Sequence, residues 1–346
     1  MLKTLGAQIK EFKKDSFLTP VFMILEVLME TIIPLMMASI IDNGVEAGDI
    51  HHIYVMGGCM VIVACISLFA GTMGGKYGAR ASAGFARNLR KAMYENIQTF
   101  SFSNIDKFST AGLVTRLTTD VTNLQNAYQM LLRMCVRAPI SLICAMIMAF
   151  FINARLASVY LIAVIVLGMI LAIITVRAHH YFMEVFPKYD DLNASVQENV
   201  SAIRVVKAYV REDYEKKKFT QASKNIYNMF VKAEGVLAFN SPVMQIAVYS
   251  CIIALSWLGA KMIVAGSLTT GELMSLLTYC MNIMMSLMML SMVFVMLAMS
   301  IASAERICEV LNEKSDITNP ENPVYEVADG SVTFDHVTFR YNKTSD

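Results

Sequence analysis

Hydrophobic positions form six long runs along the chain, and this pattern predicts six membrane-spanning helices. Four uncharged runs are each long enough for the hydrocarbon core of a bilayer, which takes about 20 apolar residues. They cover residues 53–75, 156–176, 235–260 and 273–304. A weaker run at 17–41 is interrupted by Glu26 and Glu30, and another at 138–154 is long enough only if its helix continues back through Arg133.

The positive charges between these runs lie almost entirely on one side. Of the 29 Lys and Arg, all but Arg155 and Lys261 fall in the first 16 residues, in the connections 76–137 and 177–232, or in the tail from Arg306. The positive-inside rule therefore predicts that these segments, and both termini, are cytoplasmic.

The two long cytoplasmic connections predict helical arms. Apolar residues recur at helical spacing in each connection. They are Phe85, Leu89, Ala92, Met93 and Ile97 in the first and Val200, Ile203, Val206, Tyr209 and Val210 in the second. An arm of about 25 helical residues extends roughly 35–40 Å. We expect each connection to be a helical hairpin with a short element at its tip, which holds another domain away from the bilayer.

Composition supports a membrane protein. Hydrophobic residues make up 56% of the chain and charged residues 16%, with a net charge of +1, whereas soluble domains are about 45–50% apolar and about 25% charged. This excludes a disordered chain, argues against a soluble enzyme and gives no reason to expect nucleic acid as a partner. The seven Cys lack CxxC spacing and mostly lie in apolar runs, which predicts packing residues and no metal site.

The chain changes character after Leu311. Residues 312–330 are polar, contain Pro320 and Pro323, and are typical of a linker. Apolar and polar residues then alternate within 331–346, which predicts the first β-strands of a water-soluble domain. The expected organisation is an N-terminal cytoplasmic segment (1–16), a six-helix membrane domain (17–311), the linker, and an incomplete second domain.

Four sequence motifs carry a family resemblance. They are DKFSTAGLVTRLTTD at 106–120, QENVSAIRVVKAY at 197–209, GSLTTGEL at 266–273 and ASAERI at 302–307. In this order, and with six spans, they resemble ATP-binding cassette (ABC) exporters over essentially the whole chain. Ala111 and Ala202 stand where many members have Gly. The sequence of residues 118–125 most resembles that of bacterial multidrug exporters built from two different halves.

The resemblance implies an all-α exporter membrane domain followed by an α/β nucleotide-binding domain. Two such halves would form a pump in the plasma membrane of a bacterium, and the resemblance slightly favours a heterodimer over a homodimer. ATP and Mg²⁺ would power the pump. The hairpin tips, near 104–110 and 197–203, would couple the spans to the nucleotide-binding domains. The residues implied there are Asp106, Lys107 and Phe108 in the first tip and Gln197, Glu198, Asn199 and Val200 in the second.

The resemblance also implies that Tyr341 stacks on adenine. The phosphate-binding pattern GxxxxGK[ST] does not occur in the 346 residues. We therefore assign no catalytic residue and expect that this chain alone does not hydrolyse ATP. Two alternatives remain, namely a six-span secondary transporter or receptor, and a truncated fragment of an exporter.

The sixth span holds eight Met within 19 residues, on a helical arc of about 140°. Thioethers are flexible and polarisable, so a methionine face can adapt to ligands of different shape. We hypothesise that this face lines a cavity for apolar, drug-like or lipid substrates, with helix packing as the alternative. The candidate residues are Met281, Met285, Met288, Met292 and Met296.

Glu26 and Glu30 lie one helical turn apart in the first span. A charged side chain near the bilayer centre costs about 2.5–3.5 kcal/mol on insertion scales, so both are expected to face the bundle or water. One interpretation is a site for cationic substrates. The other is a structural role, with Thr31 or a neighbouring helix as partner.

Overall fold

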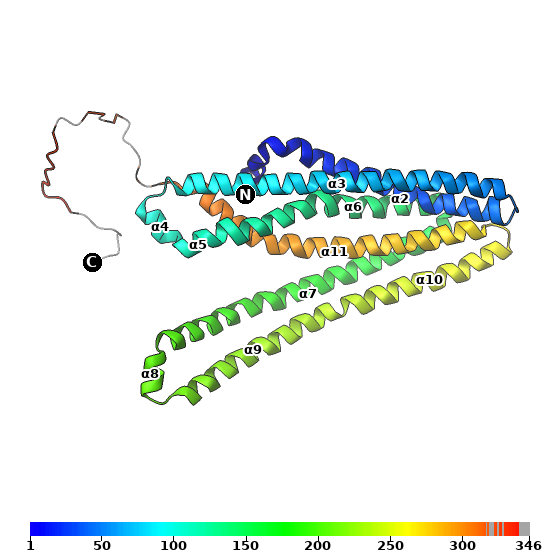
Figure 1. The fold of residues 1–346 in the computed structure, drawn as a ribbon. Coiled ribbons are helices and arrows are strands. Elements are labelled where there is room, and N and C mark those ends of the chain that lie inside the picture. Colours follow the sequence, from blue (N-terminus) through cyan, green and yellow to red (C-terminus); the bar gives the residue numbers. More distant parts are fainter. Residues whose placement is uncertain (316, 318–321, 324, 327–328, 339–346) are drawn as a thin grey trace. The chain divides into compact units, whose positions relative to one another are not determined.

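The computed structural model describes residues 1–315, 317, 322–323, 325–326 and 329–338, and it is almost entirely helical (Figure 1). The elements are α1 (Leu2–Gly6), η1 (Ala7–Phe12), α2 (Lys13–Ser39), η2 (Ile40–Val45), α3 (Ile50–Ile97), α4 (Phe102–Phe108), α5 (Thr110–Thr115), η3 (Arg116–Asp120), α6 (Val121–Ile152), α7 (Ala154–Ser201), α8 (Ile203–Ala208), α9 (Glu212–Ala238), α10 (Asn240–Val264) and α11 (Thr270–Asn312).

Six helical segments are long and apolar enough to cross a membrane, which confirms the six predicted spans. They are Leu2–Val45, Ile50–Ile97, Thr110–Ile152, Ala154–Ala178, Glu212–Val264 and Thr270–Val293. The helices α3 and α7 each contain 48 residues and so extend about 70 Å at 1.5 Å per residue. This is roughly twice the hydrocarbon thickness, so both continue beyond their spans as the predicted arms.

One compact unit comprises Met1–Leu25, Phe69–Arg137 and Met292–Asp346. Its core contains Phe85, Leu89 and Met93, each at most 3% exposed, which confirms the apolar face predicted for the first arm. The N-terminal helices pack on α3 where a Cβ at Gly84 would lie only 2.3 Å from the Phe12 ring. A side chain larger than hydrogen at that position would displace the Phe12 ring.

The second unit comprises Glu26–Leu68 and Ala138–Ser291. Its core is built by α6, α7, α10 and the first half of α11, and its hydroxyl groups bond to the backbone. Tyr160 donates to the carbonyl of Leu276 at 2.9 Å, and Tyr279 to that of Thr31 at 2.6 Å. Since a buried hydroxyl without a partner is costly, these bonds let large aromatic side chains fill the core.

The start of α11 is fixed by Asp42, near the end of the first span. Its carboxylate accepts hydrogen bonds from the Thr269 hydroxyl at 2.6 Å and from the Gly271 amide at 2.8 Å. These are amide and hydroxyl donors at a helix N-terminus, which favours a negative charge. A Cβ at Gly271 would lie 2.5 Å from the Ala38 carbonyl oxygen, so this close approach requires glycine.

The second arm is a hairpin of α7 and α9 with the short helix α8 at its tip, but the apolar residues that recur at helical spacing fall in different elements. The helix α7 ends at Ser201, α8 has only six residues, and Val210 adopts a left-handed φ of 52°. Several of these residues are consequently exposed: Val200 by 66%, Tyr209 by 75% and Val210 by 80%. The helical spacing of these residues does not mark one buried face, because the chain reverses here.

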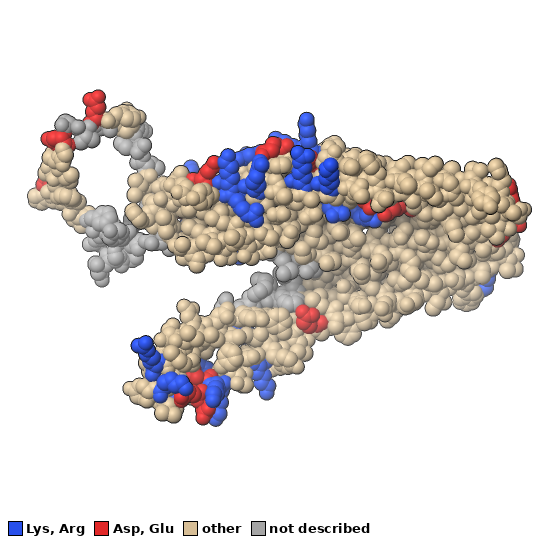
Figure 2. Space-filling view, in the orientation of Figure 1, with Lys and Arg blue, Asp and Glu red and all other residues tan. Residues whose placement is uncertain are grey.

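Charge is distributed unevenly over the second unit. Figure 2 shows Lys, Arg, Asp and Glu gathered around α8 and the start of α9, whereas the surface of α10 carries almost none. A tip exposed to water and a span exposed to lipid require this contrast.

The part of the chain that the structure describes contains no β-strand. The strand predicted at 332–334 is irregular backbone in the structure, where no second strand is present among the described residues to accept its hydrogen bonds. Residues 339–346, including Tyr341, lie outside the described residues.

Candidate coupling and substrate sites

The tip of the first hairpin is the short helix α4. Ser101 and Asn104 form its capping box, in which the Ser101 amide donates to Asn104 Oδ1 at 3.1 Å. At its other end, Ser109 has a φ of 54°, and its hydroxyl accepts the amide of Gly112 at 3.2 Å, which starts α5. These caps satisfy helix-end groups that the short helix cannot satisfy itself.

Phe108 anchors this tip from the inside. Its side chain is 5% exposed and stacks on Phe100 with 5.7 Å between the ring centroids. The Arg116 guanidinium lies 4.7 Å and the Lys107 ammonium 5.1 Å from the Phe108 ring centroid. Of the three residues assigned to this tip, Phe108 therefore packs in the core and Lys107 is exposed, while the side chain of Asp106 lies outside what the structure describes.

The exposed apolar surface of α4 consists of two residues that the sequence analysis did not single out. Phe102 is 81% exposed and Ile105 36%. Their spacing of three places both on one face of the helix. Two apolar residues three positions apart, directly before the first motif, were the sequence signal that could have identified this exposed surface.

Three ion pairs fasten the last turns of α11 to the first hairpin, and we call these six residues the C-terminal clamp. The pairs are Arg306 with Asp120, Glu309 with Arg116, and Glu313 with Lys107. The last two have N–O distances of 2.8 Å. Arg306 binds in a bidentate manner, with Nε 2.8 Å from Oδ2 and Nη2 2.5 Å from Oδ1 of Asp120.

Asp120 is the most buried member of the clamp, with 1% of its side chain exposed. The Ser303 hydroxyl also donates to it, at 2.9 Å. Its carboxylate raises the pKa of the Arg306 guanidinium above its usual value. This pair is therefore a charge-assisted, two-point contact of the strong kind.

The far end of the clamp is held by further polar contacts. The hydrogen bond from Lys107 is the main cause that lowers the pKa of the Glu313 carboxyl below its usual value, and a bond from Asn104 contributes. The Asn96 amide donates to the carbonyls of Val310 and Glu313 at 2.7 and 3.0 Å. These carbonyls belong to the end of α11, where intrahelical partners are missing.

The tip of the second hairpin lies further along the chain than predicted. Its short helix is α8, Ile203–Ala208, whereas Gln197 to Val200 belong to the last turns of α7. There Asn199 donates to Glu215 at 3.0 Å, and Lys218 to Glu198 at 3.2 Å. These contacts join the last turns of α7 to α9, next to α8 in the chain.

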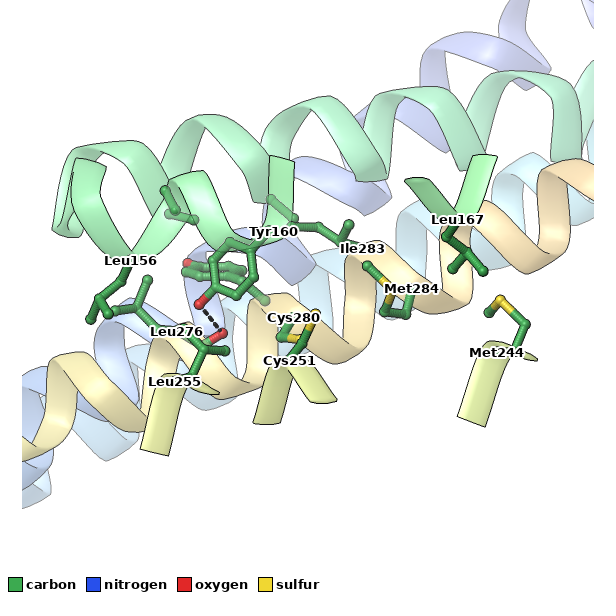
Figure 3. Close-up of a cluster of buried hydrophobic side chains, with 14 of the residues drawn as sticks. Leu156, Tyr160, Leu167, Met244, Cys251, Leu255, Leu276, Cys280, Ile283 and Met284 are labelled. Atoms are coloured by element: carbon green, nitrogen blue, oxygen red, sulfur yellow. Dashed lines mark hydrogen bonds between the residues drawn. The ribbon is translucent and has the colours of Figure 1, made fainter. Parts of the chain in front are cut away.

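The methionines of α11 do not all face the same surroundings. Met281, Met285, Met288 and Met292 are 45–64% exposed and recur at intervals of three or four, so they form one helical stripe, which we call the Met stripe. Met284 is 1% exposed in the core (Figure 3). The single arc of eight expected from the sequence is thus divided, with the neighbouring Met296 half-buried.

Glu26 and Glu30 are both half-buried on α2. Thr31, considered as a partner, donates its hydroxyl to the Val27 carbonyl at 2.6 Å. Elsewhere, the part of the chain that the structure describes holds no group of three or more His, Cys, Asp and Glu able to bind a metal ion.

Six spans with helical arms define a multi-pass membrane protein. Residues 16–288 match the ABC transporter transmembrane region, and the chain belongs to this family.

Curated relatives agree with this membership. The chain is 31% identical over 321 residues to an uncharacterized ABC transporter ATP-binding protein, YfiB, of Bacillus subtilis; the match covers 93% of the chain and 56% of that protein. It is 25% identical over 253 residues to a fatty acid ABC transporter ATP-binding/permease protein of Mycobacterium tuberculosis, over 73% and 40% of the two chains. It is 28% identical over 201 residues to YheI of B. subtilis, a probable multidrug resistance ABC transporter ATP-binding/permease protein, over 58% and 34%.

Proposed function

We propose that the chain is the membrane half of an ATP-driven exporter that moves apolar, drug-like or lipid substrates out of the cytoplasm by alternating access. The relatives' names, one for fatty acids and one for multidrug resistance, support this substrate class. The chain spans a little more than half of the YfiB relative. Two halves, with a heterodimer slightly favoured, would work in a bacterial plasma membrane with both termini in the cytoplasm.

The observation that carries the proposal is the C-terminal clamp. It joins the first hairpin tip to the end of α11 and to Glu313, at the start of the segment 312–330 that leads toward the proposed ATP-binding part. A nucleotide-binding domain docked on α4 would therefore act on the tip and on the end of the sixth span as one body. A movement of the docked domain would therefore reach the membrane helices through the first hairpin tip and the end of α11 together.

The surface offered for docking on α4 is the exposed pair Phe102 and Ile105. On the second hairpin, Val210 and Tyr209 are the most exposed apolar candidates around α8, followed by Val200. In the proposed pump ATP and Mg²⁺ bind to the nucleotide-binding domains, with Tyr341 stacking on adenine. This chain supplies the docking tips.

The test uses the full-length transporter in lipid vesicles and compares Phe102→Ala with Val114→Ala. Val114 is also an exposed apolar residue of the first hairpin, at 56%, but it lies on α5. Truncating an interface anchor costs about 2 kcal/mol or more, so Phe102→Ala should strongly reduce substrate-stimulated ATP hydrolysis while leaving the melting temperature unchanged. Equal activity of the two variants would contradict docking through α4.

The Met stripe is the proposed substrate surface, with Glu26 and Glu30 favouring cationic compounds. Replacing Met285, Met288 and Met292 by Leu keeps the volume and removes the thioethers. We expect a changed order of preference among substrates of different shape, measured by stimulated ATPase, and no change for Met274→Leu, which is 52% exposed near the start of α11. An unchanged order for the triple variant would favour helix packing.

For the carboxylates, Glu26→Gln with Glu30→Gln should reduce transport of cationic compounds more than that of neutral ones. Equal transport of both classes would assign the pair a structural role.

A further inference from the structure

A cationic surface lies where the N-terminal segment leads into the first span, and we call Lys10, Lys13 and Lys14 the N-terminal lysines. All three are exposed, and Figure 2 shows Lys and Arg gathered over this stretch of the first unit. Within the part of the chain that the structure describes, none of the three forms an ion pair. The protein itself therefore leaves this positive charge without compensation.

The carboxylates of the same segment are engaged with α3. Glu11 pairs with Arg87, and Asp15 lies 3.7 Å from Arg80. The Asn88 side chain also donates to Glu11, at 3.2 Å. Because α3 holds both acidic groups, the N-terminal lysines are available to an anion from outside the chain.

One face of α2 changes from cationic to apolar within a single turn. Lys13, Phe17 and Val21 are four residues apart and so lie on one face of the helix, where Phe17 is 72% and Val21 42% exposed. Thr19, on the opposite side of the helix, is fully buried. An exposed face on which apolar side chains follow lysine is typical of a helix at the boundary between water and lipid.

The lysines lie close to this boundary. The apolar run of the first span begins at Phe17, and Lys13 and Lys14 precede it by four and three residues, or about 5–6 Å along the helix. This is within the Debye length of about 8 Å at physiological ionic strength, so both lysines interact with charge at the membrane surface. The macrodipole of α2 opposes cations in its first turn, so the stability of the helix does not account for them.

We propose that Lys13 and Lys14, supported by Lys10, bind the phosphate of an anionic phospholipid whose acyl chain lies against Phe17 and Val21. In a zwitterionic phospholipid the choline group offsets the phosphate charge, so this site prefers phosphatidylglycerol to phosphatidylcholine. The lipid is a bound partner of the first unit and not a transport substrate. It holds the start of the first span at the membrane surface.

The test places the photoreactive residue benzoylphenylalanine at Phe17 of the full-length transporter, in vesicles of equal parts phosphatidylglycerol and phosphatidylcholine. After illumination, mass spectrometry identifies the lipids cross-linked to this position. The experiment contains neither ATP nor transport substrate, so its result is independent of the proposed transport function. The lysines are tested by the double variant Lys13→Gln with Lys14→Gln.

The matched control is Lys217→Gln with Lys224→Gln, which removes the same charge from α9. Both residues are exposed, and the nearer one, Lys224, precedes the apolar run 235–260 by eleven residues, or about 16 Å along the helix. At that distance the charge of a membrane surface is largely screened.

We expect phosphatidylglycerol to be cross-linked in excess of its share of the vesicles, and high salt to reduce this excess. An anionic surface strengthens the binding of each nearby lysine about fivefold, so Lys13→Gln with Lys14→Gln should lower the excess by up to about 30-fold, whereas the control variant should leave it unchanged. Equal cross-linking of the two lipids to the protein with both lysines, the absence of any lipid adduct at position 17, or an excess that survives the double variant would overturn the proposal.

Discussion

The pair Asp120–Arg306 allows a quantitative prediction because its two members differ in burial. The Asp120 side chain is 1% exposed and that of Arg306 47%. Arg306→Ala leaves a carboxylate in the interior with the Ser303 hydroxyl as a hydrogen-bond donor and the Arg116 charge nearby. Asp120→Asn leaves a guanidinium that can turn toward water. We therefore expect the two variants to differ, although they break the same contact.

The magnitudes follow from these two situations. Removing one partner of a buried ion pair costs about 3–5 kcal/mol, which applies to Arg306→Ala as an upper range because Arg306 is half-exposed. Asp120→Asn loses a hydrogen bond to a charged group, worth about 1.5–3 kcal/mol, and part of this is recovered by hydration. As a control, Lys91→Ala breaks the exposed pair with Glu95, whose N–O distance is 3.8 Å, and should cost at most about 0.5 kcal/mol.

The assay is thermal unfolding of the purified protein in one detergent, with Asp120→Asn, Arg306→Ala and the double variant in one cycle. Residues in one ion-pair network couple by about 0.5–3 kcal/mol, so the double variant should be more stable than the sum of the single losses predicts. If Asp120→Asn were the more destabilising single variant, or the effects were additive, the reasoning from burial would be refuted.

Three further predictions concern packing and titration. Gly271→Ala should destabilise by about 1–3 kcal/mol, since its Cβ would strike a backbone carbonyl, whereas Gly57→Ala, with open space around it, should be neutral or stabilising by up to about 1 kcal/mol; melting curves compare them. Phe108→Ala should cost about 3–5 kcal/mol in the same assay, and a loss near zero would contradict its anchoring role. The pKa of Glu313 is lowered in the folded protein. Its contribution to the stability of the folded state is therefore complete above the unfolded pKa of about 4.3 and is lost as pH falls through the folded pKa. Hydrogen exchange of the α4 amides should increase as this contribution is lost, and Glu313→Gln should remove the pH dependence.

The sequence predicted those parts of the fold that depend on local periodicity. The six spans were confirmed, and Phe85, Leu89 and Met93 lie in the core as their spacing indicates. In both cases one helix face has one kind of surroundings over many turns, which is the condition under which helical spacing is informative.

Helical spacing did not predict which residues are buried where the chain turns, or where one helix face lies partly in the core and partly at the surface. Val200 and Val210 belong to different elements, although their spacing fits one helix. Met284 is buried while Met285 is 61% exposed, because the boundary between core and surface runs along this part of α11. The motif at 106–120 located the first tip but not its working face, since whether Phe102 or Phe108 is exposed depends on packing against α11 and α6.

The charges of the C-terminal clamp also fix the register of α11 against the first hairpin. Along α11 the order is Arg306, Glu309 and Glu313, and the facing residues are Asp120, Arg116 and Lys107. A slip that moved Glu309 opposite Asp120 would bring two carboxylates together, and the opposite slip would set Arg306 against Arg116. Each slip thus creates a like-charge contact next to a buried group, and such contacts are costly. The native alignment has three attractive pairs, whereas each neighbouring alignment has one attractive and one like-charge pair, so the clamp favours the native register more strongly than a row of three identical pairs would.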